Sequence, residues 1–288
     1  MAMKAASKPA LASIVSERIE QLTVTDRRIA RFLLDDPGAV AFGTAASFAE
    51  LVGAGVGSVH RLAVQLGFSG FRDLQAQVQR EISQRLRPAA EKIRTKATGD
   101  VIDLALQTET NNVSQSLINI DRTDLSLAVK SLANVEKNVF IVSGNSSSGV
   151  ALQISQELHL LRQGITLLSG NPVGLSAQIA VATKGDVLVV IDFHRYDRWL
   201  VHFVKQATDN GLVVISIADS VLAPFAKSAT CHFTVSARSD TPFDSHVGTL
   251  ALCAVLVGSV ATLLRRDASR RLDAIERNWK SGEHLTAI

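Results

Sequence analysis

The stretch SFAELVGAGVGSVHRLAVQLGFSGFRDL, residues 47–74, predicts two short helices joined by a tight turn. Ser47 and Glu50 have the Ser-x-x-Glu spacing of a capping box, so we expect Ser47 to cap the first helix. The small residues 53–55 then interrupt the apolar pattern and predict the turn. The remainder of the stretch carries the second helix and a short turn after it.

The second helix, residues 56–66, has one apolar side and one polar side. Val59, Leu62 and Leu66 are spaced three and four residues apart, so they face a single core. Two short helices around a small turn, the second with a polar outer face, are typical of a helix-turn-helix. The residues expected to meet DNA are Ser58, Arg61 and Gln65 on the polar side, with His60 at its edge.

The segment AGVGSVHRLAVQLGFSGFRDL resembles the DNA-binding segment of RpiR-type (MurR/RpiR) bacterial transcriptional regulators. The matching pieces are Ser58-Val59, Arg61, Leu66-Gly67-Phe68 and Gly70-Phe71. The resemblance implies that 56–66 is a recognition helix for the major groove. The chain departs from the family at Gly55, where the family usually has Ser at the helix cap. The spacing by itself is equally compatible with an ordinary helical hairpin that carries an exposed arginine.

Length and charge predict two domains with different tasks. The chain has 288 residues, 47% of them hydrophobic, which predicts a globular protein of two domains. Residues 1–96 hold 14 Lys and Arg against 9 Asp and Glu, a net charge of +5. Residues 97–288 hold 16 against 18, a net charge of −2. A basic front part suits DNA, although an excess of this size also arises by chance.

Cysteine usage and the N-terminal sequence predict a cytoplasmic protein. Cys231 and Cys253 have no metal-binding spacing, so we expect two buried, reduced thiols. Residues 1–10 lack the apolar core of a signal peptide. Residues 247–264 carry no charge and reach the minimum length of a membrane span. Their regularly spaced small residues favour a buried packing helix or a dimer helix over a span.

The pattern along the chain changes from helical to alternating. Residues 1–86 predict an all-α helix-turn-helix domain, 87–99 a linker, and 100–288 an α/β domain. In the last part, helices at 101–120 and 125–132 precede five short apolar runs that alternate with helical segments. This alternation predicts a doubly wound, mostly parallel five-stranded sheet. The expected strands are 139–142, 165–168, 187–191, 212–217 and 233–235, and the expected helices between them are 149–162, 174–182, 199–209 and 222–227.

The loop that follows the first expected strand, residues 143–149, is the strongest candidate for a ligand site. It reads SGNSSSG and leads into a helix, so helix amides and serine hydroxyls can hold an anion such as phosphate. It has neither a Walker Gly-Lys-Ser/Thr nor a GxGxxG pattern, which argues against a dinucleotide. The alternative is a polar turn whose serine only caps the helix.

The arrangement of 125–240 resembles the SIS (sugar isomerase) domain that RpiR-type regulators carry behind their DNA-binding domain. The markers are the loop at 143–149, the strand spacing, and Lys184-Gly185-Asp186-Val187 before the third strand. The resemblance implies a phosphosugar-type effector contacted by Asn145, Ser146, Ser147 and Ser148.

The loop after the third strand departs from the SIS pattern. A Ser/Gly/Thr-rich phosphate loop is usual there, whereas this chain has His194, Arg195 and Tyr196. Arg195 can bind a phosphate or a carboxylate, so an organic acid other than a sugar phosphate becomes plausible. Arg195 as an ordinary surface charge is the alternative. After the fourth strand, Ser220 either completes the pocket or caps a turn, and Ser245 and His246 are further candidates for the same cleft.

We therefore predict a transcriptional regulator that binds operator DNA, senses a small anionic metabolite, and forms a homodimer or homotetramer. The predicted effector residues are Asn145, Ser146, Ser147, Ser148, His194, Arg195 and Ser220. We predict no cofactor, no metal site and no catalytic activity. The alternative is a sugar-phosphate isomerase with an accessory helical domain. Its acid–base candidates are Asp192 with His194, and Glu157 with His159, but neighbouring residues rarely orient each other as a triad requires.

Overall fold

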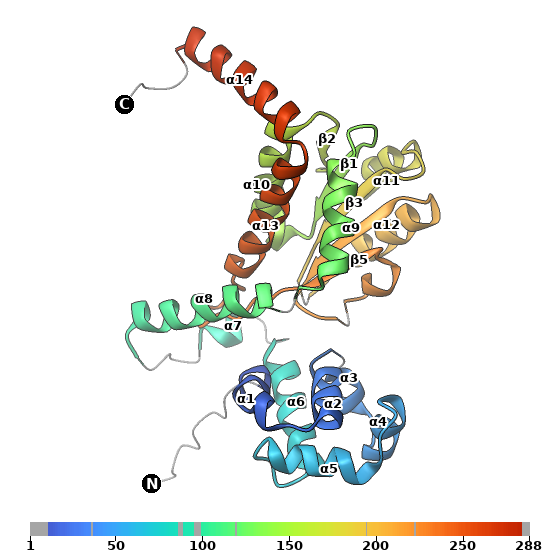
Figure 1. Cartoon of the computed structure of the whole chain (residues 1–288), viewed down its shortest axis with the longest axis vertical. Helices are drawn as coiled ribbons and strands as arrows, with labels where there is room; N and C mark the ends of the chain where they lie inside the picture. The colour runs from blue at the N-terminus through green and yellow to red at the C-terminus, as the bar shows by residue number, and fades with distance from the viewer. Residues whose placement is uncertain are drawn as a thin grey trace. The chain divides into compact units, whose positions relative to one another are not determined.

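The computed structural model describes residues 11–35, 37–85, 89–94, 99–118, 120–193, 195–221 and 223–283. The chain divides into two compact units, Met1–Arg87 and Pro88–Ile288. The predicted linker begins at this division, and part of it forms the short helix α7, Ala89–Lys92. Figure 1 shows a helical unit and an α/β unit, which are described separately below.

The first unit is entirely helical in its described part. Its elements are α1 (Leu11–Arg18), η1 (Ile19–Gln21), α2 (Val24–Asp35), α3 (Pro37–Phe42), α4 (Ala45–Leu51), α5 (Val56–Gln65) and α6 (Phe71–Arg85). Ile29, Leu33, Phe48, Leu62 and Leu74 are fully buried and belong to one core. The predicted all-α front domain is confirmed.

The start of α4 corrects the predicted cap. Thr44, not Ser47, is the N-cap residue, and its hydroxyl accepts the Ser47 amide at 3.1 Å. The Thr44 amide in turn donates to the Ser47 hydroxyl at 2.8 Å, so Ser47 occupies the position that Glu50 was expected to fill. At the start of α2, the Thr23 hydroxyl likewise accepts the amide of a residue three positions later, Asp26, at 3.2 Å. Helix α4 therefore begins earlier than its apolar pattern indicates.

The turn between α4 and α5 closes the first helix in a defined way. Gly53 has φ +60°, and its amide donates to the Glu50 carbonyl at 3.0 Å. The Ala54 amide donates to the Ala49 carbonyl at 2.9 Å. This pair of bonds is a Schellman motif, which requires a left-handed residue and so favours glycine. The small residues of the turn thus fix how α5 leaves α4.

The second unit is built on a five-stranded parallel sheet in the order β2-β1-β3-β4-β5. The strands are β1 (Val139–Ser143), β2 (Ile165–Leu167), β3 (Val187–Ile191), β4 (Val213–Ala218) and β5 (Cys231–Thr234). The central strand β3 is buried along its whole length and pairs with β1 and β4. The chain moves outward from β1 to β2, then returns to place β3 on the other side of β1. Such a reversal creates a crevice at the carboxyl ends of β1 and β3.

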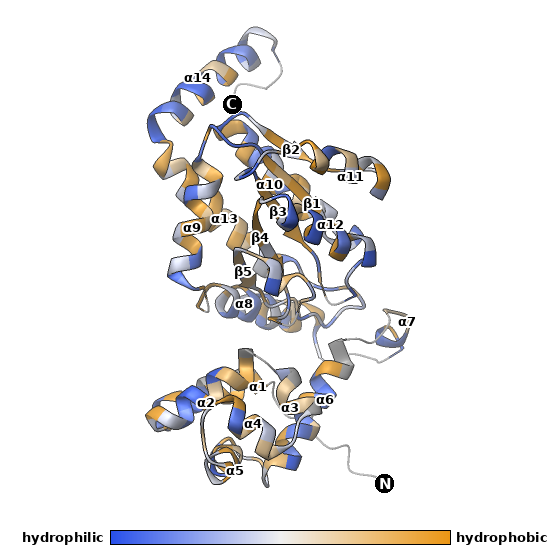
Figure 2. Cartoon of the chain, turned by 90° about the vertical axis from the view of Figure 1, so that its right-hand side faces the viewer, coloured by the Kyte–Doolittle hydropathy of each residue, from blue (hydrophilic) through white to orange (hydrophobic). Residues whose placement is uncertain are grey.

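Helices cover both faces of this sheet (Figure 1). On one face lie α9 (Arg122–Ala133), α10 (Ser148–Leu161) and α13 (Val247–Leu263), whose apolar residues share a core with Ile141, Val189 and Ile215. On the other lie α11 (Pro172–Ala180) and α12 (Arg198–Asp209), packed on Val142, Val190 and Val214. In Figure 2 the hydrophobic colour runs through the strands between these layers. The predicted doubly wound parallel sheet is confirmed.

Several elements differ from the sequence prediction, and the clearest differences are in the α/β unit. The segment expected as a helix at 222–227 contains only a 3-10 turn, η3 (Ala226–Ser228), in its described part. The helix expected at 101–120 is α8 (Val101–Ile118). An unexpected helix, α14 (Arg265–Ser281), follows α13 and is largely hydrophilic in Figure 2.

The uncharged helix α13 packs inside the α/β unit. Leu252, Cys253, Leu256 and Val260 are buried against the sheet, and Gly248 lies so close to Ser116 of α8 that a Cβ atom would collide with its hydroxyl. Among the described helices, none is by itself long and apolar enough to cross a membrane. Only α13 and α14 taken together meet the length and composition of a span, and the pair is bent by 102°.

Candidate nucleic-acid interface and effector site

Helix α5 presents a polar face to solvent. Val59 and Leu62 are buried, whereas His60, Arg61 and Gln65 are exposed and Ser58 is half-buried. The Arg61 guanidinium donates to the Ser58 hydroxyl at 3.0 Å, so both groups lie on the same face. Three of the four residues predicted to bind DNA are therefore exposed, and the fourth, Ser58, is partly exposed.

His60 has a more structural position than the other three. A Cβ atom at Gly70 would lie 2.7 Å from its Cε1 atom, so the imidazole covers the turn after α5. Gly67, the first residue of that turn, has φ +84°, and its amide bonds to the Val64 carbonyl at 2.9 Å. The Phe68 amide bonds to the Ala63 carbonyl at 2.9 Å, a second Schellman motif. Residues 66–71, which read LGFSGF, thus contain the turn that ends α5.

Two arginines outside the helix-turn-helix donate hydrogen bonds to its backbone, and neither was predicted from the sequence. Arg28 of α2 donates to the Gly53 carbonyl at 3.1 Å, which holds the turn. Arg18 of α1 donates to the Gln65 carbonyl at 2.7 Å, where a positive charge complements the C-terminal end of the α5 dipole. The sequence signalled at most the arginine content of α2, which has three, whereas Arg18 is the single arginine of α1.

The serine loop, residues 143–149, joins β1 to α10 at the crevice. It turns through the 3-10 helix η2 (Asn145–Ser147) into the N-terminus of α10. Ser147 is the N-cap residue, yet its hydroxyl makes no capping bond. The Ser147 side chain is fully buried, and its hydroxyl has no hydrogen-bond partner among the described residues. Asn145, Ser146 and Ser148 are exposed.

The loops after β1 and β3 are in contact, as the predicted shared site requires. The Gly144 amide donates to the Ile191 carbonyl at 3.0 Å, and the Asn145 amide donates to Asp197 Oδ2 at 3.4 Å. A Cβ atom at Gly144 would lie 2.0 Å from Asp192 Oδ1, so only glycine fits there. An anion at the serine loop would therefore lie close to the carboxylates of Asp192 and Asp197. This proximity was not predicted from the sequence.

Asp192 is a buried carboxyl beneath the serine loop. Its oxygens accept the amides of Phe193 and Asp197, each at 2.9 Å. Burial raises the pKa of Asp192 to about 6, an effect that the two amides oppose and the charges of Asp197 and Asp219 reinforce. A carboxyl of this kind responds to added charge in the crevice near neutral pH.

Arg195 and Ser220, two further predicted effector residues, follow β3 and β4. Arg195 is exposed beside the crevice. His194 lies outside the described residues. Tyr196 donates to Asp219 Oδ1 at 2.8 Å, and the Ser220 carbonyl lies 3.1 Å from His232 Nε2. Because β4 is two strand spacings from β1, about 10 Å, Ser220 is farther from the serine loop than Arg195.

Of the two candidates at the start of α13, the structure brings only His246 to the crevice. The His246 ring stacks on the Phe193 ring, with ring centroids 5.0 Å apart. The His246 side chain also hydrogen-bonds to the backbone of Ser146. Burial lowers the pKa of His246, while the Ser146 backbone and Asp244 oppose that shift. Ser245 instead donates to Glu109 of α8 at 2.5 Å. His246 therefore connects the loops after β1 and β3.

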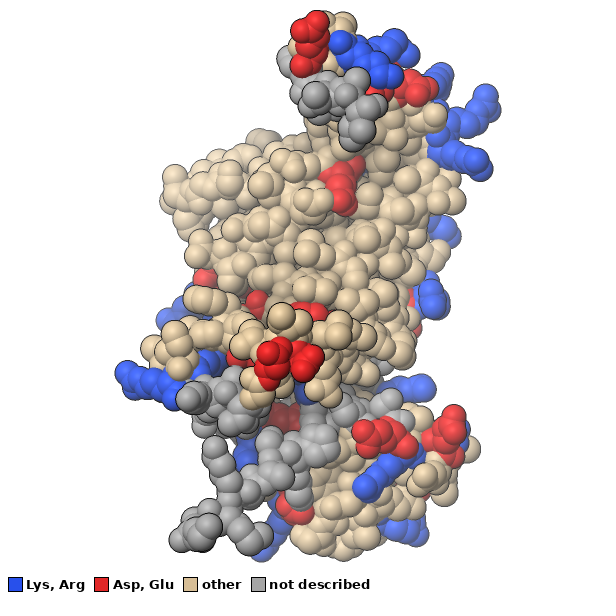
Figure 3. Space-filling model, turned by 90° about the vertical axis from the view of Figure 1, so that its left-hand side faces the viewer, with Lys and Arg blue, Asp and Glu red and all other residues tan. Residues whose placement is uncertain are grey.

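A groove of about 480 Å³ opens between α10 and α13 beside the serine loop. Its lining includes Ser146, Gly149 and His246. In Figure 3, which shows the side on which α10 and α13 lie in Figure 1, a broad area of the α/β unit carries few charged side chains. Two residues of the serine loop, Ser146 and Gly149, thus line one end of the groove.

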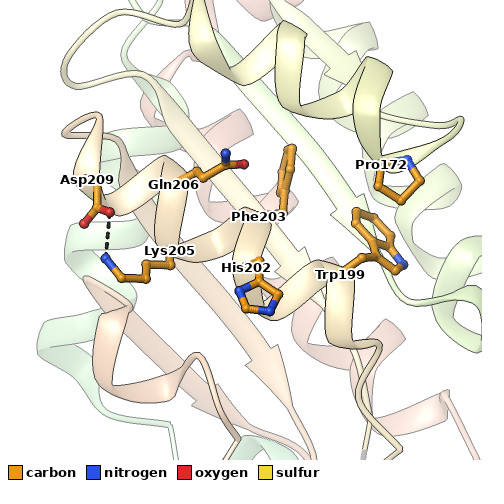
Figure 4. Close-up of a pocket in the computed structure, with 7 residues that line it drawn as sticks. All are labelled: Pro172, Trp199, His202, Phe203, Lys205, Gln206 and Asp209. Carbon is orange, nitrogen blue, oxygen red and sulfur yellow. Dashed lines mark hydrogen bonds and ion pairs between the residues drawn. The ribbon is translucent and has the colours of Figure 1, made fainter.

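A second depression, of about 400 Å³, lies on the opposite face of the sheet between α11 and α12. Figure 4 shows Trp199 and Pro172 near one end and the Lys205–Asp209 ion pair at the other. None of the serine-loop residues lines this depression. It is not part of the candidate effector site.

The described acid–base candidates Asp192 and Glu157 bond to groups other than a histidine. No three of the described His, Cys, Asp and Glu side chains are placed to hold a metal ion. Both carboxylate oxygens of Asp192 accept backbone amides, and Glu157 bonds to Gln153 rather than to His159. Cys231 and Cys253 are buried free thiols, whose pKa values burial raises to about 11 and about 12.

Comparison with known proteins agrees with this architecture. Residues 10–85 match the helix-turn-helix domain of the rpiR family, and residues 131–259 match the SIS domain. The transcriptional regulator HexR of Pseudomonas aeruginosa is 25% identical over 261 residues, which are 88% of each chain. The chain belongs to the RpiR family of helix-turn-helix regulators.

Two solved structures show the same fold as this RpiR-family chain. The sugar isomerase domain of an RpiR transcription factor from Sphaerobacter thermophilus matches 62% of this chain and 99% of that one, with a TM-score of 0.58 and 22% identity. The Vibrio vulnificus NanR protein, complexed with ManNAc-6P, matches 94% of this chain and 98% of that one. Its TM-score is 0.57 and its identity 19%.

Proposed function

We propose that this RpiR-family regulator binds operator DNA through α5 and senses a small anionic metabolite at the serine loop. The observation that supports the effector site is the hydroxyl of Ser147, which is buried at the N-terminus of α10 without a hydrogen-bond partner among the described residues. Buried hydroxyls are normally hydrogen-bonded, and an anion at this place would supply the acceptor. A phosphorylated sugar is the favoured class, since NanR is complexed with ManNAc-6P.

Arg195 is the second group that we propose for the anion. The register of β1 against β3 supports a shared site, because Ser143 pairs with Ile191 and the loops that follow emerge side by side. The serine loop supplies amides and hydroxyls but no full positive charge, whereas Arg195 supplies one. Asp192 and Asp197 nearby make an uncompensated second anion unfavourable, so the site suits a ligand of low charge.

We further propose that the protein acts in the cytoplasm as a dimer or tetramer and without catalysis. Operators of helix-turn-helix proteins are read as paired half-sites, which requires two heads. A ligand can act only by favouring one arrangement of those heads over another. An isomerase activity would instead appear as turnover of sugar phosphates by the purified chain, with no preference among DNA sequences.

The test compares operator release by wild type, Ser147→Ala and Arg195→Ala across phosphorylated sugars and small carboxylates. Each variant should bind operator as wild type does but respond less to the effector. Charge-assisted hydrogen bonds contribute roughly 1.5–3 kcal/mol, so Arg195→Ala should raise the effective ligand concentration at least about tenfold. Ser147→Ala should raise it less. Equal potency in wild type and both variants would place the effector elsewhere.

A further inference from the structure

The groove between α10 and α13 has polar groups that the anion site does not use. Ser146 and Gly149 form its end at the serine loop, and Gln153 and Glu157 line it farther along α10. A Cβ atom at Gly149 would meet no atom within 4 Å, so the passage from loop to groove is open. A ligand whose anion lay at the serine loop could extend directly into this space.

The polar atoms along α10 are arranged as hydrogen-bond acceptors. The Gln153 amide nitrogen donates to Glu157 Oε1 at 2.5 Å, which leaves the Gln153 carbonyl and the rest of the Glu157 carboxylate for other donors. Glu157 is half-buried. None of the described residues that line the groove is a lysine or an arginine. The groove is therefore negative in character.

The wall formed by α13 does not offset this charge. The His246 ring stacks on Phe193 and its side chain bonds to the backbone of Ser146, and burial lowers the pKa of the imidazole, which disfavours its charged form. Leu250 and Ala254 complete that wall and are apolar. The groove thus combines an apolar wall with an acceptor-rich, negatively charged one.

We propose that this groove is a subsite for the uncharged, hydroxyl-bearing part of the effector, and that Glu157 selects against ligands with a second anionic group. The inference rests on the proposed function, since it takes the serine loop as the seat of the anion. Hydroxyl groups donate hydrogen bonds to a carboxylate, whereas a second phosphate or carboxylate would lie next to it unpaired. The ligand class is a monophosphate or monocarboxylate of a polyhydroxylated carbon chain.

The experiment uses ligand pairs that differ by one anionic group. Isothermal titration of the full-length chain would compare fructose 6-phosphate with fructose 1,6-bisphosphate, gluconate with glucarate, and inorganic phosphate as a probe of the serine loop alone. Wild type should bind the member with one anionic group at least about tenfold more tightly than the member with two. Glu157→Gln should reduce that ratio at least about fivefold, chiefly through tighter binding of the member with two anionic groups, with phosphate affinity unchanged within about twofold.

Glu136→Gln, at an exposed glutamate outside the groove, is the matched control and should leave the ratio unchanged. Equal wild-type affinity within the pairs, or the same ratio in Glu157→Gln, would overturn the subsite while leaving the serine loop in place. Failure of every probe, phosphate included, would overturn the proposed effector site as well. A changed mass of Glu157→Gln in light scattering, with an unchanged ratio, would assign the groove to contact with a second copy and overturn the inference.

Discussion

Arg61 is the residue of α5 whose loss we expect to weaken DNA binding most. It is exposed and shares a face with Ser58, to which it donates at 3.0 Å. Arg61→Ala should weaken operator binding by about 1–3 kcal/mol if the guanidinium reads a guanine. Fluorescence anisotropy of labelled operator measures the loss, and circular dichroism verifies the fold.

Two control variants separate recognition from charge and folding. Arg31→Ala removes an exposed arginine from α2 of the same unit and should weaken binding to all DNA sequences slightly and equally. Leu62→Ala removes a fully buried side chain and should instead unfold the unit. Wild-type affinity in a folded Arg61→Ala variant would contradict the assignment of α5.

Asp192 should make stability depend on pH. Burial raises its pKa in the folded state to about 6, above the ordinary value of 3.8. The stabilising contribution of the neutral carboxyl is complete below the ordinary value and is lost as the pH rises through about 6. The melting temperature of Asp192→Asn relative to wild type should therefore be higher at pH 7.5 than at pH 5. Parallel melting curves across this range would show that the carboxyl is not perturbed.

At the residue scale, the sequence predicted the position of the serine loop but not its neighbours. A run of serines before a helix is a local pattern, so Ser147 could be predicted as an effector contact. The contacts of Gly144 with Asp192 and of Asn145 with Asp197 join residues about 50 positions apart. No local pattern encodes them, because they depend on β1 lying beside β3.

The closure of α5 depends on one left-handed glycine. Gly67 has φ +84°, and a Cβ atom there would lie 2.8 Å from Arg18 Nη1. Gly67→Ala should destabilise α5 by about 1–2 kcal/mol. Gly57, inside α5, has open space around its Cβ position, so Gly57→Ala should stabilise by about 0.4–1 kcal/mol. Hydrogen exchange of the α5 amides measures both changes, and effects of the same sign would contradict this account of the turn.

At the element scale, strongly patterned segments were predicted better than charged ones. The range of β3 agrees with its prediction at both ends, because a buried central strand is a continuous apolar run bounded by polar residues. Helix α14 was missed, since it carries many charges and only a narrow apolar stripe. Near 222–227, apolar residues such as Phe225 are buried without forming a helix in the described part.

At the scale of the whole molecule, we expect two copies to associate through the outer face of α13. Leu263, at the end of α13 and outside the groove, is 58% exposed, and a Cβ atom at Gly258 would meet nothing within 4 Å. Light scattering should show a dimer or a larger assembly for wild type. Gly258→Glu should lower the mass, because it places an unpaired charge on this face.

Val181→Glu is the matched control for the assembly. Val181 follows α11 on the opposite face of the sheet and is 81% exposed, so its replacement should leave the mass unchanged. A monomeric wild type on its operator, or the same mass in wild type and Gly258→Glu, would rule out this interface.

The strand order is a property of the whole molecule that the sequence left open. Alternating apolar runs predicted a parallel sheet, but each buried parallel strand has a similar pattern, so the pattern does not specify neighbours. The order β2-β1-β3-β4-β5 places the serine loop beside the loop of Arg195, as a shared anion site requires. It also places Ser220, which follows β4, one strand farther from the serine loop. Ser220 is therefore a weaker candidate for contact with the same anion than Arg195.

The most direct test is the affinity of the full-length chain for an operator, selected from a random DNA library, with and without effector. We predict a sequence-specific complex whose affinity the effector changes by at least about fivefold, a typical coupling between two sites. Arg61→Ala should lose the complex, whereas Ser147→Ala should keep it and lose the response. Turnover of sugar phosphates by a chain with no sequence preference for DNA would contradict the account.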